Sequence, residues 1–350
     1  MTLIEAIEAG GARTPHPLPT ISVVVPATDL PSTLPRCRAA IESAAQPPEE
    51  LLVVDGPPGA GPAEARNLGA ARARGEILVF IDADVEVHED ALARVRHAFA
   101  RDEELVALFG SYDDSPDVDG LVSAFRNLLH HHVHRSSAGP AETFWTGLGA
   151  IRRETFLASG GFDASLAMLE DVDLGMRLRE ARARIALDPG LLGTHLKCFS
   201  LYEMIRSDLL DRGVPWVELL LRSGRISTTL NLGWRHRLSA VASLVFAVAL
   251  AARRPARAAP ALGALVILNR SFYSLLWRRR GPLGACAGVA LHVVHHLTAA
   301  LALPLGVLVY MRRRRSASRS AREPRASRAP APSRDRRREA SEPSPVALQR

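Results

Sequence analysis

The chain has 350 residues, of which 47% are hydrophobic, and it carries a formal net charge of +7. That length fits one globular domain plus an additional apolar region. Its three cysteines, Cys37, Cys198 and Cys286, are far apart and lack the spacing of metal ligands, which excludes a disulfide framework and indicates a reducing compartment. No charged segment followed by an apolar run opens the sequence, so we expect no cleavable signal peptide and a cytoplasmic first domain.

After a leader over residues 1–19, the first half of the chain alternates apolar runs with helical patterns. Three β-branched apolar runs predict strands that are buried on both faces: Ile21–Pro26, Leu51–Asp55 and Ile77–Asp82. Two helices are expected between them, over about Leu34–Ala45 and Glu64–Arg74. This order predicts a doubly wound α/β sheet, whose ligands bind beyond the carboxyl ends of the strands.

The following part of the domain is less regular. Strands are predicted over Val106–Gly110 and Phe144–Ile151, and helices over Val118–His132 and Glu170–Arg179. Residues 201–221 mix leucines and charged side chains at helical spacing. This helix is expected either to lie in a membrane interface or to pack on the surface of the domain.

From Leu238 onward, three apolar stretches are separated by arginines: Leu238–Ala252, Ala258–Trp277 and Leu283–Met311. A spanning helix needs ~20 apolar residues, so two or three membrane helices are expected over residues 236–311, with buried helices of a soluble domain as the alternative. The arginine-rich residues 312–350 predict a disordered basic tail that flanks the membrane rather than binding nucleic acid. The predicted location is the inner (plasma) membrane, multi-pass, with the domain over residues 20–235 in the cytoplasm.

The most informative motif is Asp82–Ala83–Asp84, which directly follows a predicted buried strand. Two carboxylates that are one residue apart at a strand end point into the same crevice. They suit a hard divalent cation such as Mg²⁺ or Mn²⁺ and leave coordination positions for diphosphate oxygens. Capping of the next helix by these aspartates is the alternative.

Several segments resemble, in the same order, those of family 2 glycosyltransferases with the GT-A fold. They are the strands ISVVVP and LLVVD, the segment GPAEARNLGAARARGE, the strand and triplet ILVFIDADV, and FWTGLGAIRRETFLASGGFD followed by LEDVDLGMRLREA. The resemblance covers residues 20–200. It implies a GT-A-type mixed sheet and a metal-dependent enzyme that moves a sugar from a nucleotide-diphosphate donor to a hydroxyl acceptor with inversion.

The resemblance also implies roles for individual residues. Asp55 matches the carboxylate that contacts the nucleotide base. Asp82 and Asp84 match the diphosphate and metal site, with Asp84 as the expected direct ligand. Asp171 matches the general base, and Glu170 is the neighbouring carboxylate that raises its proton affinity.

Five further positions complete the predicted site. Arg66 and Asn67 lie in the segment that lines the donor pocket of the family. Trp145 is interpreted as an aromatic surface beside the sugar or the acceptor, and Gly147 as a position where the backbone can approach it closely. The alternative is that Trp145 is a buried core residue. His195 matches a late ligand to the metal or the diphosphate.

Other basic side chains are weaker candidates. Lys197 is a candidate for phosphate charge. Within the histidine cluster at residues 130–134, only His130 and His134 are expected to share a helix face, so a transition-metal site is not favoured.

The segment after Asp55 departs from the family. The family has a further helix and strand before the Ala–Arg–Asn segment, whereas residues 56–62 lead directly to it here. A non-catalytic membrane scaffold is therefore one alternative. A nucleotidyltransferase is another, although Pro26–Asp29 lacks the basic glycine-rich loop that it would need. Because the domain precedes membrane segments, a lipid-linked or glycan acceptor is expected, and no nucleic acid partner.

Overall fold

The computed structural model describes residues 17–117, 119–224 and 233–320, with side chains as far as Arg315. Residues up to Tyr310 form one compact unit and Met311 begins a second. Most of the predicted leader and the predicted disordered tail beyond residue 320 lie outside the described residues.

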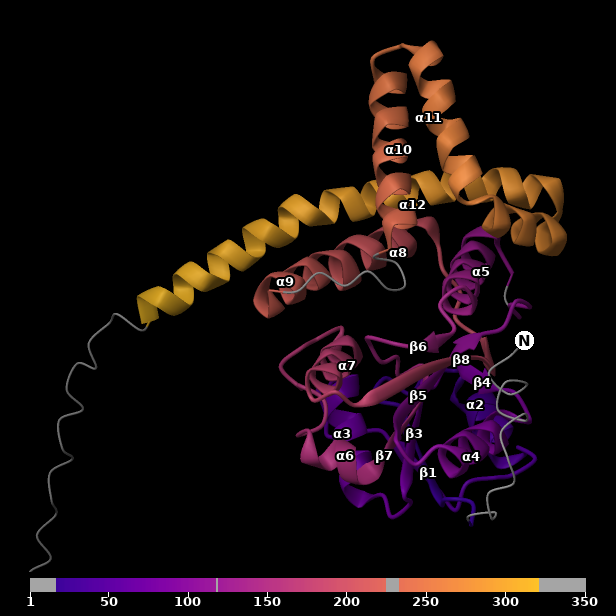
Figure 1. Cartoon of the computed structure of the whole chain (residues 1–350), viewed down its shortest axis with the longest axis vertical. Coiled ribbons are helices and arrows are strands. Elements are labelled where there is room, and N and C mark those ends of the chain that lie inside the picture. Colours follow the sequence, from indigo (N-terminus) through magenta and orange to yellow (C-terminus); the bar gives the residue numbers. More distant parts are fainter. Residues whose placement is uncertain (1–16, 118, 225–232, 321–350) are drawn as a thin grey trace, which may run out of the picture. The chain divides into compact units, whose positions relative to one another are not determined.

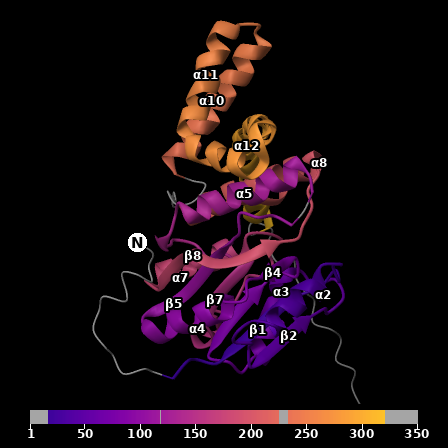
Figure 2. The same cartoon turned by 90° about the vertical axis from the view of Figure 1, so that its right-hand side faces the viewer.

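An eight-stranded mixed sheet forms the centre of the first unit (Figures 1 and 2). Its strand order is β2-β1-β3-β7-β5-β8-β4, and β6 pairs with β8. The strands are β1 (Ile21–Pro26), β2 (Glu50–Val54), β3 (Ile77–Ile81), β4 (Val85–Val87), β5 (Leu105–Tyr112), β6 (Gly139–Pro140), β7 (Leu148–Arg152) and β8 (Arg184–His195). The predicted doubly wound mixed α/β sheet is confirmed.

The register of the sheet brings several strand ends to one edge. Strands β1, β2 and β3 are parallel, and β7 runs against β3 with Leu148 opposite Ile81. Strand β5 runs against β7 and parallel to β8, and β4 runs against β8 with Val85 opposite His195. The carboxyl ends of β1, β2, β3, β5 and β8 therefore share an edge with the first residues of β4 and β7.

Helices cover both faces of the sheet. They are α2 (Leu34–Glu42), α3 (Pro62–Arg72), α4 (Ala91–Arg101), α6 (Arg153–Ala158) and α7 (Glu170–Glu180). One apolar core lies between the sheet and α2 with α4, where Ile41 and Val95 are buried. A second core lies between the sheet and α3, α6 and α7, where Ala70 and Leu174 are buried. This three-layer packing explains the continuous apolar sequences of the central strands.

The remaining helices form a separate group above the sheet edge where these strand ends meet (Figure 2). They are α5 (Leu121–Arg135), α8 (Leu201–Arg206), the π-helix η1 (Ser207–Gly213), α9 (Val214–Ser223), α10 (Trp234–Ala251), α11 (Pro255–Leu268) and α12 (Arg270–Ser320). Phe125 of α5, Met204 of α8 and Phe272 of α12 share a third apolar core. The backbone of Gly281 has φ +68°, which glycine adopts without strain, and it divides α12 into two helical parts.

One helix among the described residues, Arg270–Arg315, is long and apolar enough to cross a membrane. Only 28% of its most apolar window is buried, so it is not a buried core helix. Two histidines of this helix bond to protein groups. His292 Nδ1 and the Tyr273 hydroxyl share a hydrogen bond of 2.9 Å, and His295 Nδ1 lies 2.7 Å from Asp208 Oδ2. The structure does not support the predicted multi-pass arrangement of two or three spanning helices.

Three sequence-based boundaries were wrong for local reasons. The helix predicted over Ala258–Trp277 is interrupted at Asn269, whose side chain donates to the Leu265 carbonyl at 2.9 Å and to Ser239 Oγ at 2.8 Å. Strand β7 begins at Leu148 rather than Phe144. Strand β8, which was not predicted, is half polar because only alternate residues face the core.

Candidate functional site

The predicted site residues gather at the shared edge of the sheet. Asp55 follows β2, Asp82 follows β3, and Asp84 directly precedes β4. Gly147 directly precedes β7, and His195 ends β8. The topology alone therefore places side chains that are up to 140 residues apart in sequence along a single edge of the sheet.

Arg66 links the two halves of this edge. It is buried on α3, and its guanidinium donates to Asp82 Oδ1 at 2.6 Å and to Glu170 Oε1 at 2.5 Å. Burial alone would lower the pKa of Arg66, but the charges of Asp82 and Glu170 raise it above its ordinary value. The charged guanidinium therefore fixes the start of α7 against the end of β3.

Asp171 occupies the first turn of α7 beside this pair. Its Oδ2 accepts from the Thr146 amide at 3.3 Å and from Thr146 Oγ1 at 3.4 Å, and its Oδ1 accepts from the Val172 amide at 2.8 Å. Burial raises the pKa of Asp171 by more than Arg66 lowers it. Burial and the neighbouring Asp171 likewise raise the pKa of Glu170. Asp171 is thus a carboxylate with increased proton affinity, as a general base requires.

Asp84 and His195 form a second pair on the other side of the edge. His195 Nε2 lies 3.6 Å from Asp84 Oδ2, and the Leu196 amide donates to the Asp84 carbonyl at 2.8 Å. The His195 ring stacks on Tyr112, with centroids 4.1 Å apart and an interplanar angle of 14°. The Asp84 side chain retains 25% of its exposure, whereas His195 retains 10%. The pair is therefore held by the Tyr112 ring and the Leu196 amide, while Asp84 stays partly accessible to a ligand.

This pair suits a divalent cation by its chemistry. A carboxylate oxygen and an imidazole nitrogen are both ligands of Mn²⁺-like ions, so Asp84 and His195, whose Oδ2 and Nε2 are 3.6 Å apart, could together hold such an ion. Over the side chains of residues 17–117, 119–224 and 233–315, no group of three or more His, Cys, Asp and Glu is gathered to hold a metal. One oxygen of Asp82 accepts from Arg66 instead.

An aromatic cluster closes the edge between the two pairs. The centroid of the Trp145 ring lies 5.0 Å from that of Tyr112, 4.6 Å from that of His130 and 5.3 Å from that of His134. The rings of His130 and His134 are 3.8 Å apart, as their helical spacing predicted. A Cβ on Gly147 would lie 2.1 Å from the Trp145 ring, so only glycine permits this arrangement. Tyr112 was missed in the sequence because an aromatic residue at a strand end is also typical of a core.

Asn67 and Asp55 are placed differently from the other predicted residues. The Asn67 amide donates to the Phe162 carbonyl at 2.8 Å and accepts from the Phe162 amide at 2.9 Å, so it fixes the loop before α7. Asp55 is exposed at the end of β2, the edge strand of the sheet. The loop after it leads directly into α3, which agrees with the shortened segment seen in the sequence.

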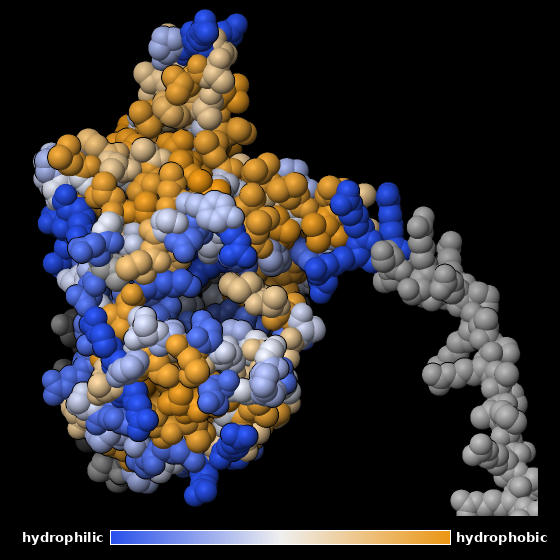
Figure 3. Space-filling model, turned by 180° about the vertical axis from the view of Figure 1, so that it is seen from behind, coloured by the Kyte–Doolittle hydropathy of each residue, from blue (hydrophilic) through white to orange (hydrophobic). Residues whose placement is uncertain are grey.

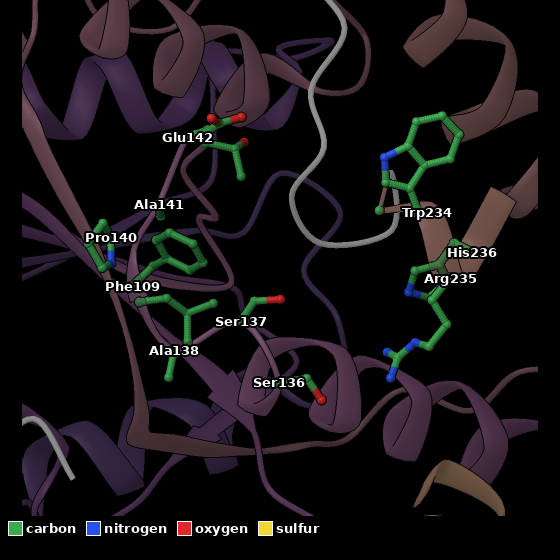
Figure 4. Close-up of a pocket in the computed structure, with 13 residues that line it drawn as sticks. Phe109, Ser136, Ser137, Ala138, Pro140, Ala141, Glu142, Trp234, Arg235 and His236 are labelled. Atoms are coloured by element: carbon green, nitrogen blue, oxygen red, sulfur yellow. The ribbon is translucent and has the colours of Figure 1, made fainter. Parts of the chain in front are cut away.

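A hollow of about 520 Å³ lies apart from these residues (Figure 4). Residues 233–236 at the start of α10 line one side of it, and residues 136–138 and 140–143 with Phe109 and Leu187 line the other. None of the predicted site residues lines this hollow.

Comparison with known proteins finds sequence similarity to glycosyltransferases. Residues 32–157 match the family model of Glycosyl transferase family 2. The pre-mycofactocin glycosyltransferase of Mycobacterium tuberculosis is 26% identical over 305 residues, which cover 77% of this chain, and the chain spans 63% of that relative's length. An inactive polypeptide N-acetylgalactosaminyltransferase-like protein 5 of Mus musculus is 26% identical over 171 residues, covering 43% of this chain and 40% of its own length.

The fold is also found among solved structures. A mannosyltransferase from Pyrobaculum calidifontis, solved in complex with GDP-Man and Mn²⁺, superimposes with a TM-score of 0.50 at 18% identity. The match covers 88% of this chain and 92% of that one. The expected GT-A-type mixed sheet is confirmed by this comparison.

Proposed function

We propose that this chain, in which residues 32–157 match the family model of Glycosyl transferase family 2, is an inverting glycosyltransferase with a nucleotide-diphosphate sugar donor and a hydroxyl acceptor. One observation carries the proposal. Arg66 joins Asp82, at the donor-side strand end, to Glu170, beside Asp171 on α7. A donor carboxylate and a base are thereby held along one crevice edge, as a single displacement needs.

On the donor side, Asp84 and His195 would hold Mg²⁺ or Mn²⁺, while Asp82 stays bonded to Arg66. Such an ion neutralises charge on a leaving diphosphate. The mannosyltransferase of similar fold was solved with GDP-Man and Mn²⁺, which supports both the class of donor and the metal. The exposed Asp55 is the proposed contact for the nucleotide base, and the Trp145 ring the proposed surface beside the sugar.

On the acceptor side, Asp171 is the proposed general base. Its Oδ2 accepts from Thr146, which is adjacent to Gly147 and to the Trp145 proposed to face the sugar, and this proximity supports the role of the carboxylate as the base for an acceptor hydroxyl. Proton transfer from that hydroxyl to Asp171 accompanies its attack on the anomeric carbon, and the diphosphate leaves from the opposite face. Asp171 accepts the proton because burial raises its pKa.

The C-terminal helices are the proposed membrane-binding surface. Apolar side chains cover much of this region in Figure 3, and Val241, Val245 and Val248 lie exposed on one face of α10. Arginines flank the apolar segments at residues 253–254, 278–280 and 312–315, and such clusters favour anionic lipid headgroups. A lipid-linked acceptor suits an active site that is joined to this surface through α5.

The membrane proposal is tested by flotation with vesicles that contain phosphatidylglycerol. We expect the wild-type chain to float and a Val241→Asp, Val245→Asp, Val248→Asp variant to lose most of the floated fraction. Leu157→Asp, which changes an exposed leucine of α6, is the matched control and should float like wild type. Equal flotation of both variants would remove the support for α10 as the binding surface.

The transferase proposal is tested by release of nucleoside diphosphate from a panel of UDP- and GDP-sugars by the detergent-solubilised full chain. We expect release with one donor class, dependent on Mn²⁺ or Mg²⁺ and lost in Asp171→Asn. Binding of a donor without any release by the wild type, with or without added lipid phosphate, would favour the non-catalytic scaffold. Release of pyrophosphate from a nucleoside triphosphate would instead favour a nucleotidyltransferase.

A further inference from the structure

Lys197 is the single lysine in the chain. The sequence contains 44 lysines and arginines, and every other member of that set is an arginine. A lysine ammonium is a compact point charge with three donors, whereas a guanidinium is broad and planar. A chain that uses arginine at all its other cationic positions thus places its one ammonium next to the candidate site.

The backbone holds Lys197 close to the Asp84–His195 pair. It follows His195 by two residues, and the intervening Leu196 donates its amide to the Asp84 carbonyl at 2.8 Å. The rings of His195 and Phe199 are 6.0 Å apart, and Phe199 is the ring that Lys197 approaches.

The Lys197 ammonium contacts an aromatic ring, and it has no acid partner among the described residues. Its Nζ lies 5.5 Å from the centroid of Phe199, and the same ring is approached at 4.5 Å by Arg126. Arg126 is neutralised by Asp208 at 2.6 Å. Within the described part of the chain, no carboxylate lies within 4.0 Å of the exposed Lys197 ammonium, and Glu203 is engaged in the capping box with Ser200.

The charges of the site leave a need for such a cation. Asp82, Asp84, Glu170 and Asp171 are four carboxylates along one edge, and the buried Arg66 already donates to two of them. A phosphate ligand adds further negative charge. The Lys197 ammonium, which has no acid partner among the described residues, could offset it.

We propose that Lys197 binds a phosphate group of the reacting molecules beside Asp84 and His195. The inference rests on the proposed transferase function and names a further residue for it. The phosphate belongs either to the donor diphosphate or to a lipid-phosphate acceptor, and both present the same chemistry to the ammonium.

A unique lysine makes the proposal testable by amine modification of the full chain in detergent. The Arg101→Lys variant adds a reference amine at the exposed end of α4. Acetylation of each lysine is followed by mass spectrometry with GDP, UDP or a long-chain prenyl phosphate present, each with Mg²⁺. We expect one of these ligands to slow acetylation of Lys197 by about tenfold while the reference lysine is unaffected. The protecting ligand identifies the source of the phosphate.

Substitutions provide the second measurement. Lys197→Met should weaken binding of the protecting ligand by about 10- to 100-fold, the loss expected for one charged hydrogen bond, and Lys197→Arg should recover part of it. Arg206→Met removes a nearby exposed cation whose nearest acid, Asp211, is 3.9 Å away, and it should bind like wild type. This control separates a local contact from the general field of the basic surface.

The outcomes distinguish this inference from the proposed function. If the wild type binds a nucleoside diphosphate with a divalent ion, but Lys197 is neither protected nor needed for affinity towards any of the three ligands, the role of Lys197 is overturned and the transferase stands. If neither nucleoside diphosphates nor prenyl phosphate bind to the wild type, both proposals fail.

Discussion

Asp82 and Asp84 are separated by one residue, yet the structure places them in opposite environments. Asp82 belongs to a closed network, in which the buried Arg66 is bonded to Asp82 and to Glu170. Asp84 lies 3.6 Å from His195 and stays partly exposed, and Lys197, which has no acid partner among the described residues, follows His195 by two positions. One carboxylate is therefore used to fix the architecture and the other is left available for a ligand.

The two aspartates show that one part of this sheet edge holds the fold in place and the other is available to a ligand. Breaking a buried ion pair leaves an uncompensated charge, so the Arg66 network keeps β3 and α7 in a fixed relation. The Asp84 region is stabilised from behind by stacking and by the β4–β8 register, and its polar groups face outward. Rigid positioning on one side and open coordination on the other is the arrangement that transfer between two substrates requires.

The largest effect is expected at the base. Asp171→Asn should lower kcat by about 10²- to 10⁴-fold and leave nucleotide affinity unchanged, because the amide cannot take a proton. Steady-state rates and binding measurements on the same preparation check this. Asp173→Asn, two residues along and paired with Arg177 at 2.8 Å, is the matched control. Equal losses in the two variants would contradict the assignment.

Arg66 tests the closed network. Arg66→Met should destabilise the domain by about 3–5 kcal/mol, because Asp82 and Glu170 lose their shared cation in a buried setting. The measurement is the midpoint of thermal unfolding in detergent, and adding Glu170→Gln should recover part of the loss. Arg72→Met, an exposed change on the same helix, should leave the midpoint unchanged. An unaltered midpoint in Arg66→Met would show that the network is not structural.

Gly147 tests the aromatic cluster. Gly147→Ala should cost about 1–3 kcal/mol, because the new methyl group overlaps the Trp145 ring and must displace it. Activity should fall with it if Trp145 faces the sugar, and the unfolding midpoint alone should fall if Trp145 is only a core residue. Gly61→Ala is the control, since no atom lies within 4 Å of that added Cβ.

The pH profile gives the smallest and most specific effect. The groups facing Asp171 are Arg66 from α3, Thr146, Asp82 at the end of β3, and Glu170 on its own helix. The base acts when deprotonated, so kcat/KM should be lost as pH falls through the Asp171 pKa. Because burial raises that pKa, the acid limb should lie above the value of about 3.9 of an ordinary aspartate. A limb centred at the ordinary value would contradict the environment described for Asp171.

The sequence predicted the central sheet well because its strands are buried on both faces and read as uninterrupted apolar runs. The Asp82–Ala83–Asp84 motif could be located for the same reason, since it directly follows such a strand, whereas Glu170–Asp171 was identified through family resemblance. Strand β8 was missed because only alternate residues face the core, and His195 was found through family resemblance alone. The Arg66–Asp82–Glu170 network joins residues 104 positions apart, which no local pattern reports. The count of spanning helices failed at Asn269, where a side-chain bond to the Leu265 carbonyl interrupts a predicted apolar stretch.

The division of work between the two aspartates is tested most directly by the Mn²⁺ dependence of GDP and UDP binding in the wild type, Asp84→Asn and Asp82→Asn. We predict metal-dependent binding of one nucleotide by the wild type, and its loss in Asp84→Asn without a change in the unfolding midpoint. Asp82→Asn should lower the midpoint, because Arg66 loses a partner. Metal-dependent binding that survives in Asp84→Asn at wild-type affinity would contradict the account.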